Sequence, residues 1–179
     1  MSVNLDQLIE FYKDQNFQNQ ILEQKNKIEQ MLKNFLISLE NSDRIIHGFS
    51  KRISSRIKSA DSLREKIKRK GYIDKWGLTS ETQKDEFQIQ VAEHLPDLIG
   101  LRINCYFSEE EEKIFDELIA FLSNKSTIIL EENSNQKMKN GEKIYKISGK
   151  HIELQNKFSF EIQVKSYLLD VWGEVEHKL

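Results

Sequence analysis

The 179-residue sequence contains one proline, one cysteine and seven glycines. A lone cysteine excludes an intrachain disulfide or a metal site of several cysteines, and its apolar surroundings predict that Cys105 is buried. So few prolines and glycines favour long helices and strands. The longest strictly apolar run, Leu118 to Leu122, is too short to cross a bilayer. The N-terminus lacks the basic flank and apolar stretch of a secretion signal, so we expect a cytoplasmic protein without membrane contact.

The composition indicates one globular domain with a concentrated positive segment. Hydrophobic residues make up 38% and charged residues 31% of the chain. The hydrophobic fraction is higher than that of typical disordered chains. Residues 44–70 contain ten Lys/Arg and two Asp/Glu, a local charge of +8 in a chain of net charge −2. Such a cluster attracts anions such as nucleotides or RNA, although a solvated basic face is the common alternative.

The pattern of apolar residues predicts a mixed sheet covered by helices, an α+β fold. An N-terminal helical segment, residues 1–42, should contain two helices over 4–40 with a break near Phe17. Residues 43–179 should form the main part of one compact domain. Expected strands are 44–58, 98–107, 127–131, 143–154 and 158–165. Expected helices are 60–70, 80–94, 109–123 and one from Tyr167, with a polar loop over 132–142.

A phosphate-binding element is predicted where the first strand meets the helix 60–70. Alternation places four polar side chains on one strand face: Arg52, Ser54, Arg56 and Lys58. Ser59 can cap the helix, and Ser62 and Lys66, four residues apart, share one helix face. Two ammonium groups and a helix N-terminus around one volume suit a nucleoside triphosphate.

Two carboxylates are candidates for binding Mg²⁺, which takes a few carboxylates together with phosphate oxygens. Asp97 precedes the apolar strand 98–107, although a turn or capping role is equally plausible from the pattern. Glu161 alternates with apolar residues, so the solvated face of a strand is its simpler interpretation. Arg102 is a cation in an otherwise apolar strand, which calls for a partner or a ligand.

Four blocks over about residues 45–179 resemble, in order and character, the synthetase domain of the RelA/SpoT stringent-response family. They are Arg56-x-Lys58-x3-Ser62-x3-Lys66, Asp97-Leu-Ile-Gly-Leu-Arg102, Glu161-Ile-Gln-Val-Lys165 and Trp172-Gly-Glu-Val-Glu-His177. The resemblance implies a nucleotidyltransferase-like fold, a mixed sheet flanked by helices. It also implies transfer of pyrophosphate from ATP to the ribose 3′-hydroxyl of GDP or GTP, which makes (p)ppGpp.

The resemblance also implies roles for single residues. Arg56 and Arg102 would sandwich the adenine, and Lys58, Ser62 and Lys66 would hold the ATP phosphates. Asp97 would bind Mg²⁺, and Glu161 would bind Mg²⁺ or activate the 3′-hydroxyl. Gln163 and Lys165 would support the acceptor, although the family more often has arginine in place of Lys165, which changes the binding geometry.

The acceptor-binding block departs from the family pattern, which is a Gly-Tyr-x-x-x-His run whose tyrosine stacks on guanine. The corresponding stretch is Lys143-Ile-Tyr145-Lys-Ile-Ser-Gly-Lys-His151, which lacks the glycine and has its histidine two residues late. Tyr145 and His151 are the acceptor-binding candidates, with strand packing as the alternative. A guanine nucleotide is the default acceptor, while an adenine nucleotide or tRNA stays open.

Three functions follow as alternatives: a Mg²⁺-dependent alarmone synthetase, a toxic relative that pyrophosphorylates tRNA or an adenine nucleotide, and a degenerate domain that binds nucleotide or RNA. Lysines of the stretch 137–150 could attract RNA, although solvated loop lysines are more common. The chain stops at Leu179, where the family usually continues with a Tyr-Lys pair and a further helix, and a missing C-terminal segment would explain this difference. Amphipathic helices at both ends are compatible with a homo-oligomer.

Overall fold

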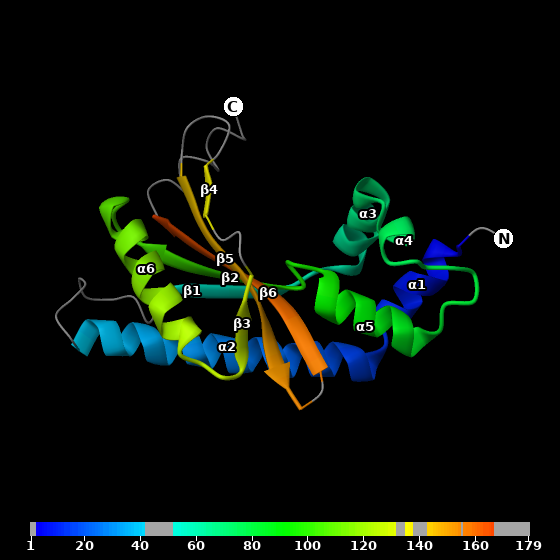
Figure 1. Ribbon diagram of the computed structural model, residues 1–179, viewed down its shortest axis with the longest axis horizontal. Helices are drawn as coiled ribbons and strands as arrows, with labels where there is room; N and C mark the ends of the chain where they lie inside the picture. The colour runs from blue at the N-terminus through cyan, green and yellow to red at the C-terminus, as the bar shows by residue number, and fades with distance from the viewer. Residues whose placement is uncertain (1–2, 42–51, 132–134, 138–142, 155, 167–179) are drawn as a thin grey trace.

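The computed structural model describes residues 3–41, 52–131, 135–137, 143–154 and 156–166. These residues form six helices and six strands (Figure 1). The helices are α1 (Leu5–Tyr12), α2 (Gln15–Asn41), α3 (Ala60–Lys70), α4 (Tyr72–Lys75), α5 (Lys84–His94) and α6 (Glu109–Ser123). The strands are β1 (Ile53–Ile57), β2 (Ile99–Cys105), β3 (Ile128–Leu130), β4 (Asn135–Lys137), β5 (Lys143–Glu153) and β6 (Asn156–Ser166).

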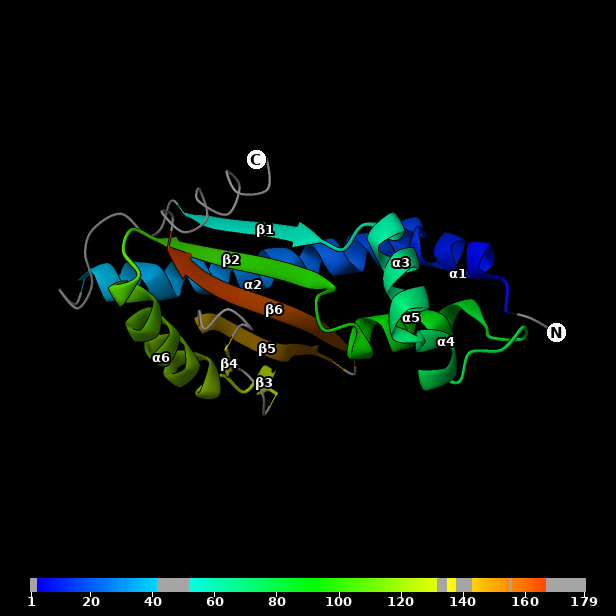
Figure 2. The ribbon, with the colours of Figure 1, turned by 90° about the horizontal axis from the view of Figure 1, so that it is seen from above.

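The strands form one mixed sheet in the order β1-β2-β6-β5-β3, and β4 pairs with the other end of β5. The β2–β6 pair is parallel, and the other pairs are antiparallel. Figure 2 shows α2 running along one face of the sheet, with α1, α3, α4 and α5 gathered at one end. The predicted α+β class, a mixed sheet with flanking helices and helices at the N-terminus, is confirmed.

Alternation in the central strands separates a buried face of the sheet from a polar one. In β2 the buried residues are Ile99, Leu101, Ile103 and Cys105, and the residues between them are half-buried. The apolar face packs against the long helices, and Phe35 of α2 also meets Phe121 of α6 with ring centroids 5.0 Å apart. The other face carries the polar side chains from which a site can be built.

Local signals explain the boundaries of α3, which begins and ends as predicted. The Ser59 side chain accepts a hydrogen bond from the backbone N–H of Ser62 and caps the first turn. Gly71 ends the helix in the left-handed conformation, with φ of 62°. Its backbone N–H bonds carbonyl groups of the last turn, which is the usual use of glycine at this position.

The predicted division of this segment into two helices is confirmed, but the break lies between Tyr12 and Gln15, slightly before Phe17. Asp14 accepts a hydrogen bond from the backbone N–H of Phe17 at 3.1 Å, so it starts α2. Phe17 is buried and meets the Tyr12 ring edge-on, with centroids 6.1 Å apart. Burial of this aromatic ring therefore favours a continuous helix through its position.

Other elements differ from prediction mainly at their ends. The helix expected from residue 80 begins at Lys84, because Thr79 and Thr82 form a hydrogen-bonded turn. The polar loop 132–142 contains the short strand β4, and the rest of it lies outside the described residues. The first part of the strand expected over 44–58 and the helix expected from Tyr167 also lie outside them. Within the described residues, none of the helices combines the length and hydrophobicity needed to span a bilayer.

Candidate active site

A cavity of about 220 Å³ opens on the polar face of the sheet, where β1, β2 and β6 lie side by side. Its lining includes Arg56, Asp97, Gly100, Arg102, Glu161 and Gln163. Strand register explains this convergence. Gly100 of β2 lies between Arg56 on β1 and Glu161 on β6. Residues from three separated stretches of sequence thus meet at one cavity.

Asp97 is held by two lysines that come from different elements. The Lys58 ammonium, just beyond β1, lies 2.6 Å from one carboxylate oxygen, and the Lys66 ammonium of α3 lies 2.5 Å from the other. Burial raises the pKa of Asp97, but the hydrogen bonds from Lys58 and Lys66 outweigh this effect and leave that pKa below its ordinary value. Asp97 is therefore ionised at neutral pH, and both lysines are held at the entrance to β2.

Glu161 also has a partner at each oxygen. The Lys146 ammonium of β5 lies 2.6 Å from Oε2, and the Gln163 amide donates to Oε1 at 2.8 Å. The Glu161 side chain is 13% exposed and that of Lys146 is 26% exposed. Sequence reasoning placed Lys146 only among lysines that could attract RNA. The available signal was alternation along β5, which puts Lys146, Ser148 and Lys150 on one face.

The remaining predicted ATP-side residues surround the same corner of the molecule. Arg56 is exposed, and its side chain lies across Gly100, where a Cβ would be 3.4 Å from the Arg56 Cγ. Arg102 is half-buried and lines the cavity. Ser62 is exposed in the first turn of α3, with its hydroxyl 2.9 Å from that of Ser59. The N-terminus of α3 thus opens next to Lys58, where an anion would be favoured.

The structure places the acceptor-side candidates in different locations. Gln163 lines the cavity, and Lys165 is half-buried two residues further along β6, opposite Asn104. Tyr145 packs against the core, and its ring centroid is 5.4 Å from that of Phe115 in α6. Because Tyr145 alternates with Lys146, its ring lies on the face opposite the cavity.

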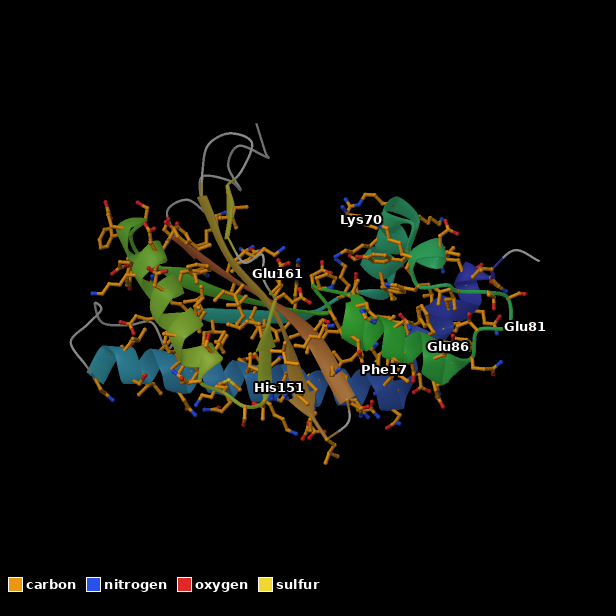
Figure 3. The ribbon with its side chains drawn as sticks, in the orientation of Figure 1. Phe17, Lys70, Glu81, Glu86, His151 and Glu161 are labelled. Carbon is orange, nitrogen blue, oxygen red and sulfur yellow. The ribbon has the colours of Figure 1, made fainter. Side chains whose placement is uncertain are left out.

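His151 is buried on the core face as well. Its Nδ1 lies 2.6 Å from the side-chain oxygen of Gln24 in α2, and burial lowers the pKa of the imidazole. Figure 3 shows His151 beside α2 and away from Glu161. The structure therefore does not bring Tyr145 or His151 to the cavity, because the odd-numbered residues of β5 face the helices.

Asp97 and Glu161 suit a hard divalent cation, since carboxylate oxygens are the ligands that Mg²⁺ prefers. Within the described part of the chain no group of three or more His, Cys, Asp or Glu side chains could hold a metal by itself. Both carboxylates nevertheless line one cavity. The donor set fits an ion that takes its other ligands from phosphate oxygens and water.

Positive charge exceeds negative charge in this site. Five cations surround the two carboxylates: Arg56, Lys58, Lys66, Arg102 and Lys146. The excess of positive charge in a half-buried site favours a ligand with several negative charges. Charge and geometry together define a candidate active site for a polyphosphate substrate.

Comparison with known proteins agrees with this description. The family model for the region found in RelA / SpoT proteins matches residues 55–179. The chain therefore belongs to the RelA/SpoT family, as the sequence motifs predicted. No curated protein matches the chain. The block around Trp172 lies outside the described residues.

Solved structures share the fold at low sequence identity. The crystal structure of small alarmone synthetase 1 from Bacillus subtilis matches with a TM-score of 0.64 and 19% identity, covering 93% of this chain and 78% of that one. The same enzyme bound to its product pppGpp matches with a TM-score of 0.61 and 18% identity, covering 92% and 81%. A GTP pyrophosphokinase family protein from Streptococcus pneumoniae matches with a TM-score of 0.64 and 16% identity, covering 91% and 74%. These matches, all below 25% identity, show that the chain shares the fold of these structures.

Proposed function

We propose that this protein transfers the β,γ-pyrophosphate of ATP to the 3′-hydroxyl of GDP or GTP in a Mg²⁺-dependent reaction. The observation that carries the proposal is the position of Asp97 and Glu161, which line one cavity among cations suited to polyphosphate. Phosphoryl-group transfer depends mainly on positioning and charge neutralisation, and this site offers both. Family membership and a neighbour whose bound product is pppGpp support the same reaction. We expect the enzyme to act in the cytoplasm.

The ATP half of the site uses the corner between β1 and α3. Lys58 and Lys66, now held on Asp97, would turn to the triphosphate, and Ser62 with the α3 N-terminus would add neutral donors. Arg56 and Arg102 have planar guanidinium groups that can stack on the adenine. Asp97, once released by the lysines, and Glu161 are the residues that would hold Mg²⁺. The ion would neutralise charge on the phosphate oxygens during transfer.

In the chemical step, a bond forms between the acceptor 3′-oxygen and the β-phosphorus of ATP. The bond from the β-phosphorus to the oxygen that bridges the α- and β-phosphates breaks, and AMP leaves with that oxygen. Glu161 would accept the proton of the hydroxyl group, while Gln163, bonded to Glu161, holds the orientation of the carboxylate. Lys165 would support the acceptor from the same strand.

A second acceptor class is favoured by one observation. Tyr145, the residue expected to stack on guanine, faces the core, while Lys146 and Lys150 alternate with it on the other side of β5. Adenine nucleotides and the 3′ end of tRNA are therefore alternative acceptors for the same chemistry. A binding-only domain is the remaining alternative, and the presence of both carboxylates in the cavity is evidence against it.

The test is transfer from γ-labelled ATP with Mg²⁺ to GDP, GTP, AMP, ADP, ATP and bulk tRNA in parallel. We expect label on a guanine nucleotide, and loss of about 10²-fold or more of the rate in Asp97→Asn and Glu161→Gln. Asp116→Asn is the control, because Asp116 is exposed on α6. Label on tRNA or an adenine nucleotide would change the substrate assignment. Full turnover in either carboxylate variant would contradict the catalytic assignment, and ATP binding without transfer would favour a binding domain.

A further inference from the structure

The ion pair between Lys146 and Glu161 occupies the carboxylate that the proposed reaction needs. Lys146 holds Oε2 at 2.6 Å and Gln163 holds Oε1 at 2.8 Å. Both members of the ion pair are largely shielded from water, so separating them without a replacement for either would be costly. Glu161 can therefore accept a hydroxyl proton readily only after Lys146 has bound another anion.

The strand that carries Lys146 borders the acceptor side of the cavity. In the β5–β6 register, Lys146 pairs with Gln163 and Ser148 pairs with Glu161. Lys150 lies on the same face of β5. Successive residues on that face are about 7 Å apart along the strand. Among the described residues that line the cavity none is aromatic. Two ammonium groups and one hydroxyl group thus lie on the face of β5 next to Glu161.

We infer that Lys146 is a specificity-determining residue that selects acceptors carrying a phosphate group. This inference rests on the proposed function. In the empty site Lys146 neutralises Glu161, and a 5′-phosphate of the acceptor nucleotide replaces the carboxylate as its partner. The exchange frees Oε2 of Glu161 for the 3′-hydroxyl of the same nucleotide. A nucleoside without phosphate offers Lys146 no new partner, so the ion pair persists and transfer is slow.

A purely structural role for Lys146 makes a different prediction. If Lys146 only kept Glu161 ionised and oriented, its removal would slow transfer to every acceptor by the same factor. If Lys146 binds acceptor phosphate, its removal raises the KM of phosphorylated acceptors because the attraction is lost. The competing ion pair is lost as well, so the preference for phosphorylated acceptors falls. The ratio between two acceptors therefore separates the two roles.

The experiment compares guanosine, GMP, GDP and GTP as acceptors for the intact chain, with labelled ATP and Mg²⁺. The variants are Lys146→Met, Lys146→Arg and the control Lys157→Met, whose lysine lies on β6 beside a separate cavity. We expect Lys146→Met to lower the GDP-to-guanosine ratio of kcat/KM by about 10- to 100-fold, the usual effect of one charged hydrogen bond. The KM for ATP should stay within about twofold, and Lys146→Arg should restore part of the preference. A ratio that is unchanged in Lys146→Met overturns the inference.

A binding measurement separates failure of this inference from failure of the proposed reaction. Calorimetric titration of GDP and guanosine into the wild type and Lys146→Met needs no turnover, and thermal unfolding verifies that the variant is folded. Tighter binding of GDP that is lost in Lys146→Met supports the role of Lys146, even if no transfer occurs with any acceptor. Equal binding of GDP and guanosine by the wild type, or a GDP preference that persists in the variant, overturns it whatever the activity.

Discussion

The hydroxyl group of Tyr12 in α1 donates a hydrogen bond to the backbone carbonyl oxygen of Lys58, 46 residues further along the chain. Burial is the main cause that raises the pKa of Tyr12 to about 12, so the hydroxyl keeps its proton at neutral pH. The Lys58 side chain in turn holds Asp97. The N-terminal helices, which precede the region matched by the family model, thus fix one edge of the candidate active site.

The substitution Tyr12→Phe tests this link. Removal of the hydroxyl leaves the partly buried carbonyl of Lys58 without this partner, so we expect the free energy of unfolding to fall by about 1–2 kcal/mol. We also expect weaker binding of ATP, because the backbone that positions Lys58 loses its anchor. Urea unfolding and ATP titration measure the two effects. Tyr106→Phe is the control, since it keeps the ring beneath the Arg52 guanidinium. ATP affinity equal to that of the wild type would show that this anchor does not position the site.

Two glycines on the sheet should respond differently to alanine. A Cβ at Gly149 would lie 2.7 Å from the Ile129 carbonyl oxygen and 2.8 Å from the Phe160 ring, neither of which can withdraw easily. We expect Gly149→Ala to lower the free energy of unfolding by about 2–4 kcal/mol, as overpacked cores do. A Cβ at Gly100 would meet the flexible Arg56 side chain at 3.4 Å and would lie 4.0 Å from the Arg56 carbonyl oxygen, an ordinary contact. Gly100→Ala should therefore keep stability within about 0.5 kcal/mol and instead weaken ATP binding.

Thermal and urea unfolding measure whether Gly149→Ala loses more stability than Gly100→Ala. Titration of the folded Gly100→Ala variant with ATP measures the expected loss of affinity. A stable Gly149→Ala would mean that β3 and Phe160 can shift away from this position. Unchanged ATP affinity in Gly100→Ala would mean that the position of Arg56 over Gly100 is not needed for the nucleotide.

Local signals made much of the fold predictable. The helix 109–123 was predicted with the bounds that the structure shows, and capping residues defined α3. The short strand β4 was missed, because three polar residues carry no alternation and the strand exists only by pairing with β5. The break between the two N-terminal helices was placed slightly too late, at Phe17, for a related reason, since the burial of this ring depends on contacts that local sequence does not reveal.

The candidate site was predictable where alternation and strand order were enough. Alternation placed Arg56 and Glu161 on polar strand faces, and Arg102 stood out as a cation in an otherwise apolar strand; the structure brings all three to one cavity. The Lys146–Glu161 ion pair depends on the register between β5 and β6, which the sequence does not specify. Assignment of Tyr145 and His151 came from motif spacing, whereas the face of β5 on which each lies follows from packing against α2 and α6.

Glu29 makes the stability of the α2–β1 contact depend on pH. Its carboxylate accepts hydrogen bonds from Lys33 at 2.7 Å and Ser55 at 2.5 Å, and these lower its pKa from 4.5 to about 2. A group whose pKa is lower in the folded state stabilises the fold above the unfolded pKa and loses this contribution as pH falls. The contribution should therefore be complete above about pH 5 and be lost between pH 4.5 and 2.

The matching variant is Glu29→Gln, which keeps the shape and removes the charge. At pH 7 we expect it to lower the free energy of unfolding by about 1 kcal/mol, a value limited by partial solvent exposure. The difference from the wild type should shrink as pH falls from 5 to 3 in urea titrations. The exposed Glu10→Gln is the control. A difference that stays constant over this range would mean that the loss is not electrostatic.

His151 should matter for stability and not for the acceptor. The buried imidazole bonds the side-chain oxygen of Gln24, so His151→Ala leaves that oxygen without this partner and should lower the free energy of unfolding by about 1–3 kcal/mol. Burial lowers the pKa of His151 below 6.5, so its contribution is complete above pH 6.5 and is lost as pH falls through the folded value. The wild type should therefore lose more stability between pH 7 and 5.5 than His151→Ala does. The exposed His94→Ala is the control.

Because His151 lies away from Glu161, the KM for the acceptor should stay within about twofold in His151→Ala. A tenfold rise in this KM in a folded variant would show that His151 acts in the acceptor site.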